Sequence, residues 1–165
     1  MAVNIREKLI NHPLPRKEKK QKLNWVQRKF TKVVNGQRVQ KQTGIEKKIE
    51  VLLRNIGLKF ETESWLKVGK KSRRYDFFIN DNNIQILLEA DGDKWHAKDY
   101  KEGKIPYIKL SKIQKMNVRN DILKDRMAKE VGIPLIRLWE TDINKNIGYC
   151  KEVVLAECKK QGHII

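Results

Sequence analysis

The feature that most restricts the fold is a short apolar segment at residues 84–90, which has the sequence Ile-Gln-Ile-Leu-Leu-Glu-Ala. Four polar residues at 80–83 precede this segment, and Gly92 follows shortly after it. An apolar run of this length between turn residues is typical of a strand that is buried on both faces. The segment therefore predicts a central strand with packed elements on either side of its sheet, as in α/β domains.

Other regular elements surround this strand in the order α-β-β-β, a long loop, and then α-β-α. The first helix is predicted by a capping box, Thr43 to Glu46, followed by apolar residues at helical spacing and by Gly57 as a stop. We expect an α/β fold with a mixed central sheet flanked by helices. The remaining expected elements are extended segments at 58–66 and 73–79, a helix at 111–130, a strand at 135–139 and a last helix to about residue 160, capped by Thr141-Asp142.

The chain is strongly basic, and its charge is unevenly distributed. It carries 37 Lys and Arg against 20 Asp and Glu, a formal net charge of +17, and twelve basic and two acidic residues fall within residues 1–41. Such an excess indicates a polyanionic partner, most commonly nucleic acid. We therefore expect residues 1–42 to form a basic arm that contacts DNA, and residues 43–165 to form one folded domain. For residues 1–20, a solvated tail without a partner is the alternative.

Composition also excludes several classes of protein. The sequence has no apolar run long enough to span a membrane and no apolar segment typical of a secretory signal near its start. Its two cysteines, Cys150 and Cys158, cannot form a disulfide framework, and their spacing is not that of a zinc site with His163. We expect an intracellular, cytoplasmic protein in which both cysteines are core residues of the last helix.

Acidic residues gather at the ends of two neighbouring predicted strands. Asp76 lies in the strand at 73–79, whereas Glu89 and Asp91 end the apolar strand and, being two residues apart, point to the same side. If the chain reverses about the middle of residues 80–83, residue 76 lies opposite a position near 87 and close to Glu89. Carboxylates on a strand that emerges from a core are costly to desolvate unless they form ion pairs or bind a metal cation.

Two interpretations of this cluster remain open at this point. Mg²⁺, for which Mn²⁺ can substitute, takes oxygen ligands and keeps several waters, so it suits a group of close carboxylates. The alternative is a set of ion pairs with nearby cations, for which Arg73, Arg74 and Lys94 are available.

Two further side chains have both a chemical and a structural interpretation. His96 follows the acids in a polar loop, where a general acid or base for phosphodiester cleavage is needed, although a lone histidine is more often structural. Glu46 occupies the N3 position of the capping box and can still face the same cleft. Trp95 is either a core residue or an aromatic wedge against a base.

The motif Tyr75-Asp76-Phe77, followed by the segment from Glu89 through Gly92 to Trp95-His96, resembles the PD-(D/E)XK nuclease superfamily. Within it, the motif is most similar to the branch that contains the very-short-patch repair endonucleases and related phage homing endonucleases. The resemblance covers about residues 43–142. It implies a restriction-endonuclease-like fold and a metal-dependent DNA endonuclease that hydrolyses phosphodiester bonds, as a homing or repair enzyme that nicks or cuts. Residues 43–165 would then be the nuclease domain.

The resemblance also implies a role for individual residues. Asp76 would be the principal metal ligand, assisted by the Glu89 carboxylate, the Ala90 carbonyl or both. His96 would activate water or protonate the leaving oxygen. The remaining catalytic positions are Glu46, which would hold the metal or its waters, and Asp121 or Asp125 on the long helix, of which Asp125 better fits the distance to Gly132.

The sequence departs from the superfamily pattern at Asp91, which stands where a lysine usually follows the glutamate by two residues. His96 or Lys94 would then supply the missing function, or Asp91 would itself be a ligand. Tyr75 replaces the proline of the family name. The expected nucleic-acid-binding residues are Arg16, Lys17, Lys19, Lys20, Arg28, Lys29, Arg38, Lys70, Lys71, Arg73, Lys94 and Trp95.

Rival functions are a non-catalytic nucleic-acid-binding protein and a junction-resolving or transposition-associated nuclease of the same fold. The sequence does not distinguish a monomer from a homodimer.

Overall fold

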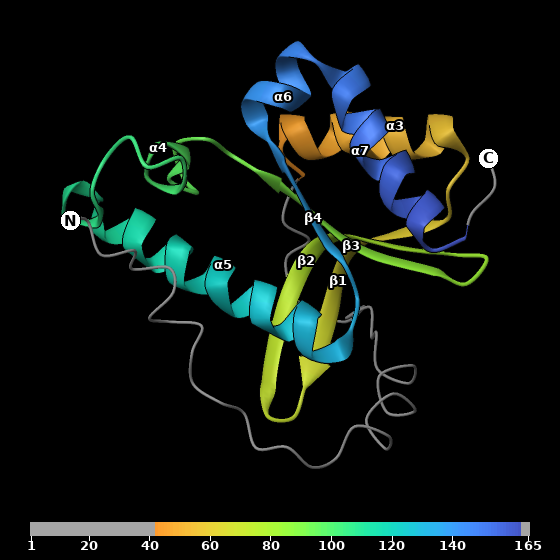
Figure 1. The fold of residues 1–165 in the computed structure, drawn as a ribbon, viewed down its shortest axis with the longest axis horizontal. Helices are drawn as coiled ribbons and strands as arrows, with labels where there is room; N and C mark the ends of the chain where they lie inside the picture. The colour runs from red at the N-terminus through yellow and green to blue at the C-terminus, as the bar shows by residue number, and fades with distance from the viewer. Residues whose placement is uncertain (1–41, 163–165) are drawn as a thin grey trace.

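The computed structural model describes residues 42–162, so the basic arm and its seven expected DNA-contacting residues between Arg16 and Arg38 lie outside the described part of the chain. The elements follow the predicted order (Figure 1). They are α3 (Gly44–Ile56), β1 (Phe60–Val68), β2 (Lys71–Asp81), β3 (Ile84–Asp91), α4 (Lys98–Lys101), the 3-10 turn η1 (Tyr107–Lys109), α5 (Lys112–Val131), β4 (Leu135–Trp139), α6 (Glu140–Lys145) and α7 (Ile147–Lys160).

The four strands form one mixed sheet in the order β1-β2-β3-β4. Strands β1, β2 and β3 are antiparallel neighbours, whereas β4 returns through α5 to lie parallel to β3. In Figure 1, α5 crosses one face of the sheet, and α3, α6 and α7 gather at the other. The expected α/β architecture, a mixed central sheet flanked by helices, is confirmed.

Each face of the sheet has its own apolar core, and β3 contributes to both. Leu87 packs toward Met127 and Ala128 of α5. Ile86 and Leu88 face the opposite way, into a core that α3 and α7 complete. Burial on both faces is the physical reason that this strand is apolar along its length. Cys150 and Cys158 belong to the second core, which confirms their expected packing role.

Helix α3 begins and ends where the sequence predicts. Thr43 Oγ1 accepts a hydrogen bond from the amide of Glu46 at 3.3 Å, and Glu46 Oε2 accepts one from the amide of Thr43 at 3.2 Å. Gly57 ends the helix with a φ of 84°, a left-handed conformation that glycine adopts without strain. The capping box therefore fixes Glu46 at the N-terminal end of α3.

The reversal between β2 and β3 is tighter than the predicted four-residue turn. Asp81 pairs with Ile84, so only Asn82 and Asn83 form the turn, both with positive φ. Two such residues in succession match a type I′ hairpin turn, which asparagine tolerates. The register is consequently shifted from the expected one. Phe77 pairs with Leu88, and the next step places Asp76 beside residue 89 rather than 87.

The C-terminal segment also differs from the prediction of one helix. It forms α6 and α7, and Asn146 separates them by accepting a hydrogen bond from the amide of Tyr149 at 3.1 Å. Asn146 thus acts as an N-cap that the sequence analysis missed. Within residues 42–162, no helix has the length and apolar character needed to cross a membrane.

Candidate active site

The predicted acids of β2 and β3 meet where β2 separates from β3. The amide of Ala90 donates a hydrogen bond of 2.9 Å to Asp76 Oδ2, which joins the two strands just beyond their last paired residues. The convergence of Asp76 with the segment at 89–91 is therefore present. This contact is made by the amide of Ala90, and the role of its carbonyl as a metal ligand stays a prediction.

Glu89 is buried, and only one of its two carboxylate oxygens has a hydrogen-bond partner among the described residues. Lys124 of α5 lies 2.6 Å from Glu89 Oε2, but Glu89 Oε1 is buried with no hydrogen-bond partner among the described residues. Burial, with the nearby charge of Asp76, raises the pKa of Glu89 to about 7, although Lys124 acts in the opposite direction.

Asp76 is under the same influences. Burial raises the pKa of Asp76, and the hydrogen bond from Ala90 and the charge of Lys124 do not cancel that effect. The charges of Glu46 and Asp91 raise it further. Glu46 therefore acts electrostatically on Asp76 while it also caps α3. Asp76 therefore feels the charge of Glu46 and itself acts on Glu89, while Lys124 contacts Glu89 and acts on Asp76 through its charge.

Tyr75 helps to position Lys124. The Tyr75 hydroxyl donates a hydrogen bond of 2.9 Å to the Lys124 carbonyl, and the Lys124 ammonium lies 5.4 Å from the centre of the Tyr75 ring. Lys124 also lies one helical turn after Asp121, so both side chains emerge from the same side of α5.

His96 is bound to Asp121 rather than to Asp125. Its Nδ1 atom lies 3.0 Å from Asp121 Oδ2, and Lys101 lies 2.7 Å from the same oxygen. Burial raises the pKa of Asp121, but the hydrogen bond to His96 and the charges of Arg137 and Lys101 outweigh burial and lower that pKa to about 2.

The pKa of His96 is shifted the other way. Burial lowers it, but the hydrogen bond to Asp121 and the charges of Asp91 and Asp121 prevail, so the pKa of His96 is raised above its usual value. Asp125, which the sequence analysis preferred, has an exposed side chain paired with Arg137 at 3.0 Å. The geometry thus favours Asp121 as the partner of His96.

Asp91 is held by a guanidinium. Arg137 Nη1 lies 2.8 and 3.0 Å from the two carboxylate oxygens of Asp91. One donor atom each from Asp91, His96 and Asp121 lie within 4.8 Å of one another, a spacing that fits a metal ion. However, Arg137 and Lys101 already balance the two carboxylates. Asp91, His96 and Asp121 thus form an ion network with these two cations. The charges of this network are closer to balance than those around Glu46, Asp76 and Glu89, so a metal ion is needed less here.

The cations that pair with the β3 acids differ from those expected. Arg73, Arg74 and Lys94 were the cations available for the alternative interpretation of ion pairs. Instead, the carboxylate of Glu89 contacts Lys124, and that of Asp91 contacts Arg137 and, at 3.8 Å, Lys101. Lys94 instead lies over the ring of Trp95. Helical spacing from Asp121 could have identified Lys124, and Arg137 stands out as a charge within the apolar strand at 135–139. Nothing in the sequence singles out Lys101.

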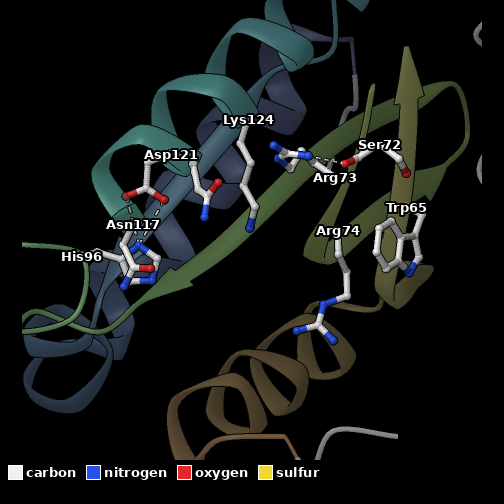
Figure 2. Close-up of a pocket in the computed structure, with 9 residues that line it drawn as sticks. Trp65, Ser72, Arg73, Arg74, His96, Asn117, Asp121 and Lys124 are labelled. Atoms are coloured by element: carbon white, nitrogen blue, oxygen red, sulfur yellow. Dashed lines mark hydrogen bonds and ion pairs between the residues drawn. The ribbon is translucent and has the colours of Figure 1, made fainter. Parts of the chain in front are cut away.

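The remaining expected DNA-contacting residues lie at the tip of the β1–β2 hairpin, in the loop after β3 and, for Arg73, beside a cavity. Lys70 and Lys71 are exposed at the tip of the β1–β2 hairpin, and Lys94 and Trp95 are exposed in the loop after β3. Arg73 lines a cavity of about 380 Å³ between that hairpin and α5, and His96, Asp121 and Lys124 contribute to the same cavity (Figure 2).

Comparison with known proteins identifies one similar protein. The type II nicking enzyme V.NmeDIP of Neisseria meningitidis serogroup C is 30% identical over 114 residues, which cover 65% of this chain and 72% of that protein. No family model matches the chain. Among solved structures, protein VC1899 from Vibrio cholerae aligns with 68% of this chain and 33% of its own, with 10% identity and a TM-score of 0.32. That structural likeness is too low to support an argument.

Proposed function

Because this chain belongs to the family of the type II nicking enzyme V.NmeDIP, we propose that it is an endonuclease that hydrolyses single phosphodiester bonds in DNA. The observation that supports this proposal most directly is the meeting of Asp76 and Glu89, two acids with raised pKa values, at the end of the central strand. Buried carboxylates with raised pKa values beside a histidine are typical of catalytic sites.

A divalent cation, Mg²⁺ or Mn²⁺, is the proposed cofactor, and Asp76 and Glu89 are the proposed residues that hold it. The donor set fits, because Glu89 Oε1 is buried with no partner within residues 42–162 and the acids of this part of the chain outnumber the cations that act on them. Glu46 adds negative charge from the start of α3, consistent with a role toward the metal's waters. When bound, such an ion polarises a phosphoryl oxygen and stabilises the charge of the transition state.

The proposed proton transfers belong to His96. Asp121 has a pKa of about 2 and is therefore ionised at neutral pH, so it accepts a hydrogen bond from His96 Nδ1. The Nε2 atom is then left to take a proton from the attacking water or to give one to the leaving oxygen. Asp121 orients the ring and stabilises its charged form, and Lys101 holds Asp121.

Lys124 is the proposed replacement for the lysine that the sequence lacks at position 91. It reaches Glu89 from α5 instead of from β3, and Tyr75 holds it there. From this position its ammonium can neutralise charge that develops on the phosphate. Asp91 then has a structural role as the partner of Arg137, not that of a ligand.

The wider proposal includes the fold family and the DNA contacts. We propose a restriction-endonuclease-like core of the PD-(D/E)XK type, with residues 43–165 as the nuclease domain and residues 1–42 as a basic arm that binds phosphates without reading sequence. Lys70 and Lys71, which are exposed at the tip of the hairpin, are proposed to bind phosphates as well. A role in homing or repair belongs to the same proposal.

Incubation of the full chain with supercoiled plasmid in Mg²⁺, Mn²⁺ or EDTA tests this function. We expect nicked circles with either metal and intact plasmid in EDTA. Asp76→Asn should abolish nicking and retain DNA binding, whereas the matched control Asp99→Asn, at an exposed acid of α4, should nick like the parent chain. Equal nicking by Asp76→Asn would contradict the site, and binding without nicking in either metal would favour a non-catalytic DNA-binding protein.

A further inference from the structure

The cavity between the β1–β2 hairpin and α5 has features that phosphodiester hydrolysis itself does not require. One end of the cavity is formed by His96 and Asp121, but most of its wall comes from residues outside the catalytic group (Figure 2). The hairpin contributes Trp65 and Arg73, and α5 contributes Asn117 and Asn120. The chain therefore builds a distinct space immediately beside the proposed reaction centre.

Arg73 is incompletely satisfied in this cavity. Its Nη1 atom donates a hydrogen bond of 2.7 Å to the carbonyl of Ser72, but its Nε atom is buried and has no partner among the described residues. A buried donor without a partner costs free energy, and a ligand that accepts from it recovers that cost. A guanidinium in this state is well suited to a phosphate oxygen, which takes charge-assisted hydrogen bonds.

The other lining residues suit a base rather than a second phosphate. Trp65 is half-buried and brings an indole ring to the cavity, on which any base can stack. The side-chain amide nitrogen of Asn117 donates a hydrogen bond of 2.9 Å to the carbonyl of Trp95, and Asn120 is exposed on the next turn of α5. Amide side chains present both donors and acceptors, which match the edges of bases.

We propose that this cavity binds the nucleotide next to the scissile phosphate, with its base stacked on Trp65 and the phosphate of a neighbouring nucleotide at Arg73, whose side chain leaves the other face of the hairpin. This inference rests on the proposed endonuclease function. A cavity of about 380 Å³ is the size of a small-molecule site, so it accommodates one nucleotide and not a base-paired segment. The nucleotide must consequently leave the base stack, as in enzymes that extrude a base.

The test uses the full chain and a duplex oligonucleotide that contains the nick site mapped on plasmid. 2-Aminopurine, whose fluorescence reports unstacking from neighbouring bases, replaces each nucleotide around that site in turn. The chain carries Asp76→Asn so that the substrate stays intact. We expect a fluorescence change at one position adjacent to the nick and at no position several nucleotides away. Unchanged fluorescence at all positions would overturn the proposal.

Variants made in the parent chain, with Asp76 intact, test whether that nucleotide binds in the cavity. Trp65→Ala should raise the KM for nicking roughly 5- to 150-fold, the range that base–aromatic stacking provides, and Trp65→Phe should restore most of the loss. Arg73→Gln should also raise KM, whereas Lys67→Gln, at an exposed residue of the same hairpin, should not. Equal KM values for Trp65→Ala and the parent chain would also overturn the proposal.

Failure of this inference is distinguishable from failure of the proposed function. If the parent chain nicks plasmid and Asp76→Asn does not, the endonuclease function stands, whatever the cavity variants do. Thermal unfolding of Trp65→Ala and Trp65→Phe separates a folding defect from lost binding. If both unfold at the parent's temperature and only Trp65→Phe keeps the parent's KM, the ring itself acts on the substrate.

Discussion

The ammonium of Lys124 lies 2.6 Å from Oε2 of Glu89, and this contact joins α5 to the central strand β3. It does not satisfy the carboxylate, because Oε1 of Glu89 stays buried without a partner among the described residues. Burial and the charge of Asp76 accordingly raise the pKa of Glu89 to about 7. The ionised form of Glu89 is thus disfavoured in the folded chain unless a further cation compensates it.

The first prediction concerns Glu89→Gln without divalent metal. The pKa of Glu89 rises from 4.5 in a model carboxyl to about 7 in the folded chain, so the folded state keeps a proton that the unfolded state releases between these values. The part of the parent chain's stability that depends on protonated Glu89 is therefore lost as pH rises through this window, and Glu89→Gln lacks this loss. In EDTA, the free energy of unfolding of the variant should gain about 3 kcal/mol relative to the parent between pH 4 and pH 8.

Urea unfolding at several pH values measures this difference. Glu157→Gln, at a partly buried carboxylate paired with Lys160 on α7, is the matched control and should give a difference that does not depend on pH. A pH-independent difference for Glu89→Gln as well would mean that Glu89 ionises normally in the folded chain.

The second prediction concerns metal binding independently of activity. A ligand that binds only the folded state raises its stability, by about 2.7 kcal/mol at a concentration of 100 Kd. Mg²⁺ or Mn²⁺ should therefore raise the Tm of the parent chain. Asp76→Asn and Glu89→Gln should abolish that rise because each removes a proposed ligand. Asp99→Asn, at an exposed acid of α4, should retain it.

The same measurement decides between the two acidic groups. Asp91, His96 and Asp121 bring donor atoms within 4.8 Å of one another and are the competing metal site. If Asp91→Asn abolishes the rise in Tm and Asp76→Asn preserves it, the ion binds in the ion network and our assignment is wrong.

The sequence predicted the fold well where local patterns determine it. The capping box at Thr43 and Glu46, the left-handed Gly57 and the doubly buried strand β3 each follow from a few neighbouring residues. The turn was misjudged because Asn80 and Asp81 are polar like Asn82 and Asn83, yet they pair within the strands. Polarity alone does not distinguish a turn residue from a polar residue that pairs within the strands of a hairpin.

The candidate site was only partly predictable for a different reason. Glu89, Asp91 and His96 were identifiable by type and order, but the side chains closest to them come from α5 and β4, more than 20 residues away. Which cation meets which acid depends on the rotation of α5 against the sheet. Asp121 and Asp125 share a helical face at i and i+4, so sequence spacing could not select the one that meets His96.

The third prediction tests the pairing of His96 with Asp121. The hydrogen bond and the charges around it raise the pKa of His96 above 6.5, so Asp121→Asn should lower that pKa. NMR titration of the histidine resonances measures the shift, and His96→Gln identifies the signal. Asp125→Asn is the matched control one turn along α5, where no contact with His96 exists, and it should leave the pKa unchanged. An unshifted His96 in Asp121→Asn would show that the pair does not form in solution.

The same pair predicts the pH dependence of nicking. If His96 acts as the base, it must be neutral, so the rate should rise with pH through the raised pKa of His96 and then level off. Asp121→Asn should reduce the maximal rate and move the rising limb to lower pH. A rate that falls through this range would assign His96 the role of acid instead.

The last prediction concerns Arg137, which holds β3, β4 and α5 together through charge. Its guanidinium lies 2.8 Å from Asp91 and reaches Asp121 at 3.5 Å and Asp125 at 3.0 Å. Arg137→Gln leaves the buried carboxylate of Asp91 without its guanidinium, and losing one partner of a buried pair costs about 3–5 kcal/mol. Arg119→Gln, at an exposed residue of α5, should change the free energy of unfolding by less than about 0.5 kcal/mol. Urea unfolding compares the two, and adding Asp91→Asn to Arg137→Gln should recover part of the loss, because the unpaired charge is then removed. A double variant no more stable than Arg137→Gln alone would show that Asp91 is not the group that depends on Arg137.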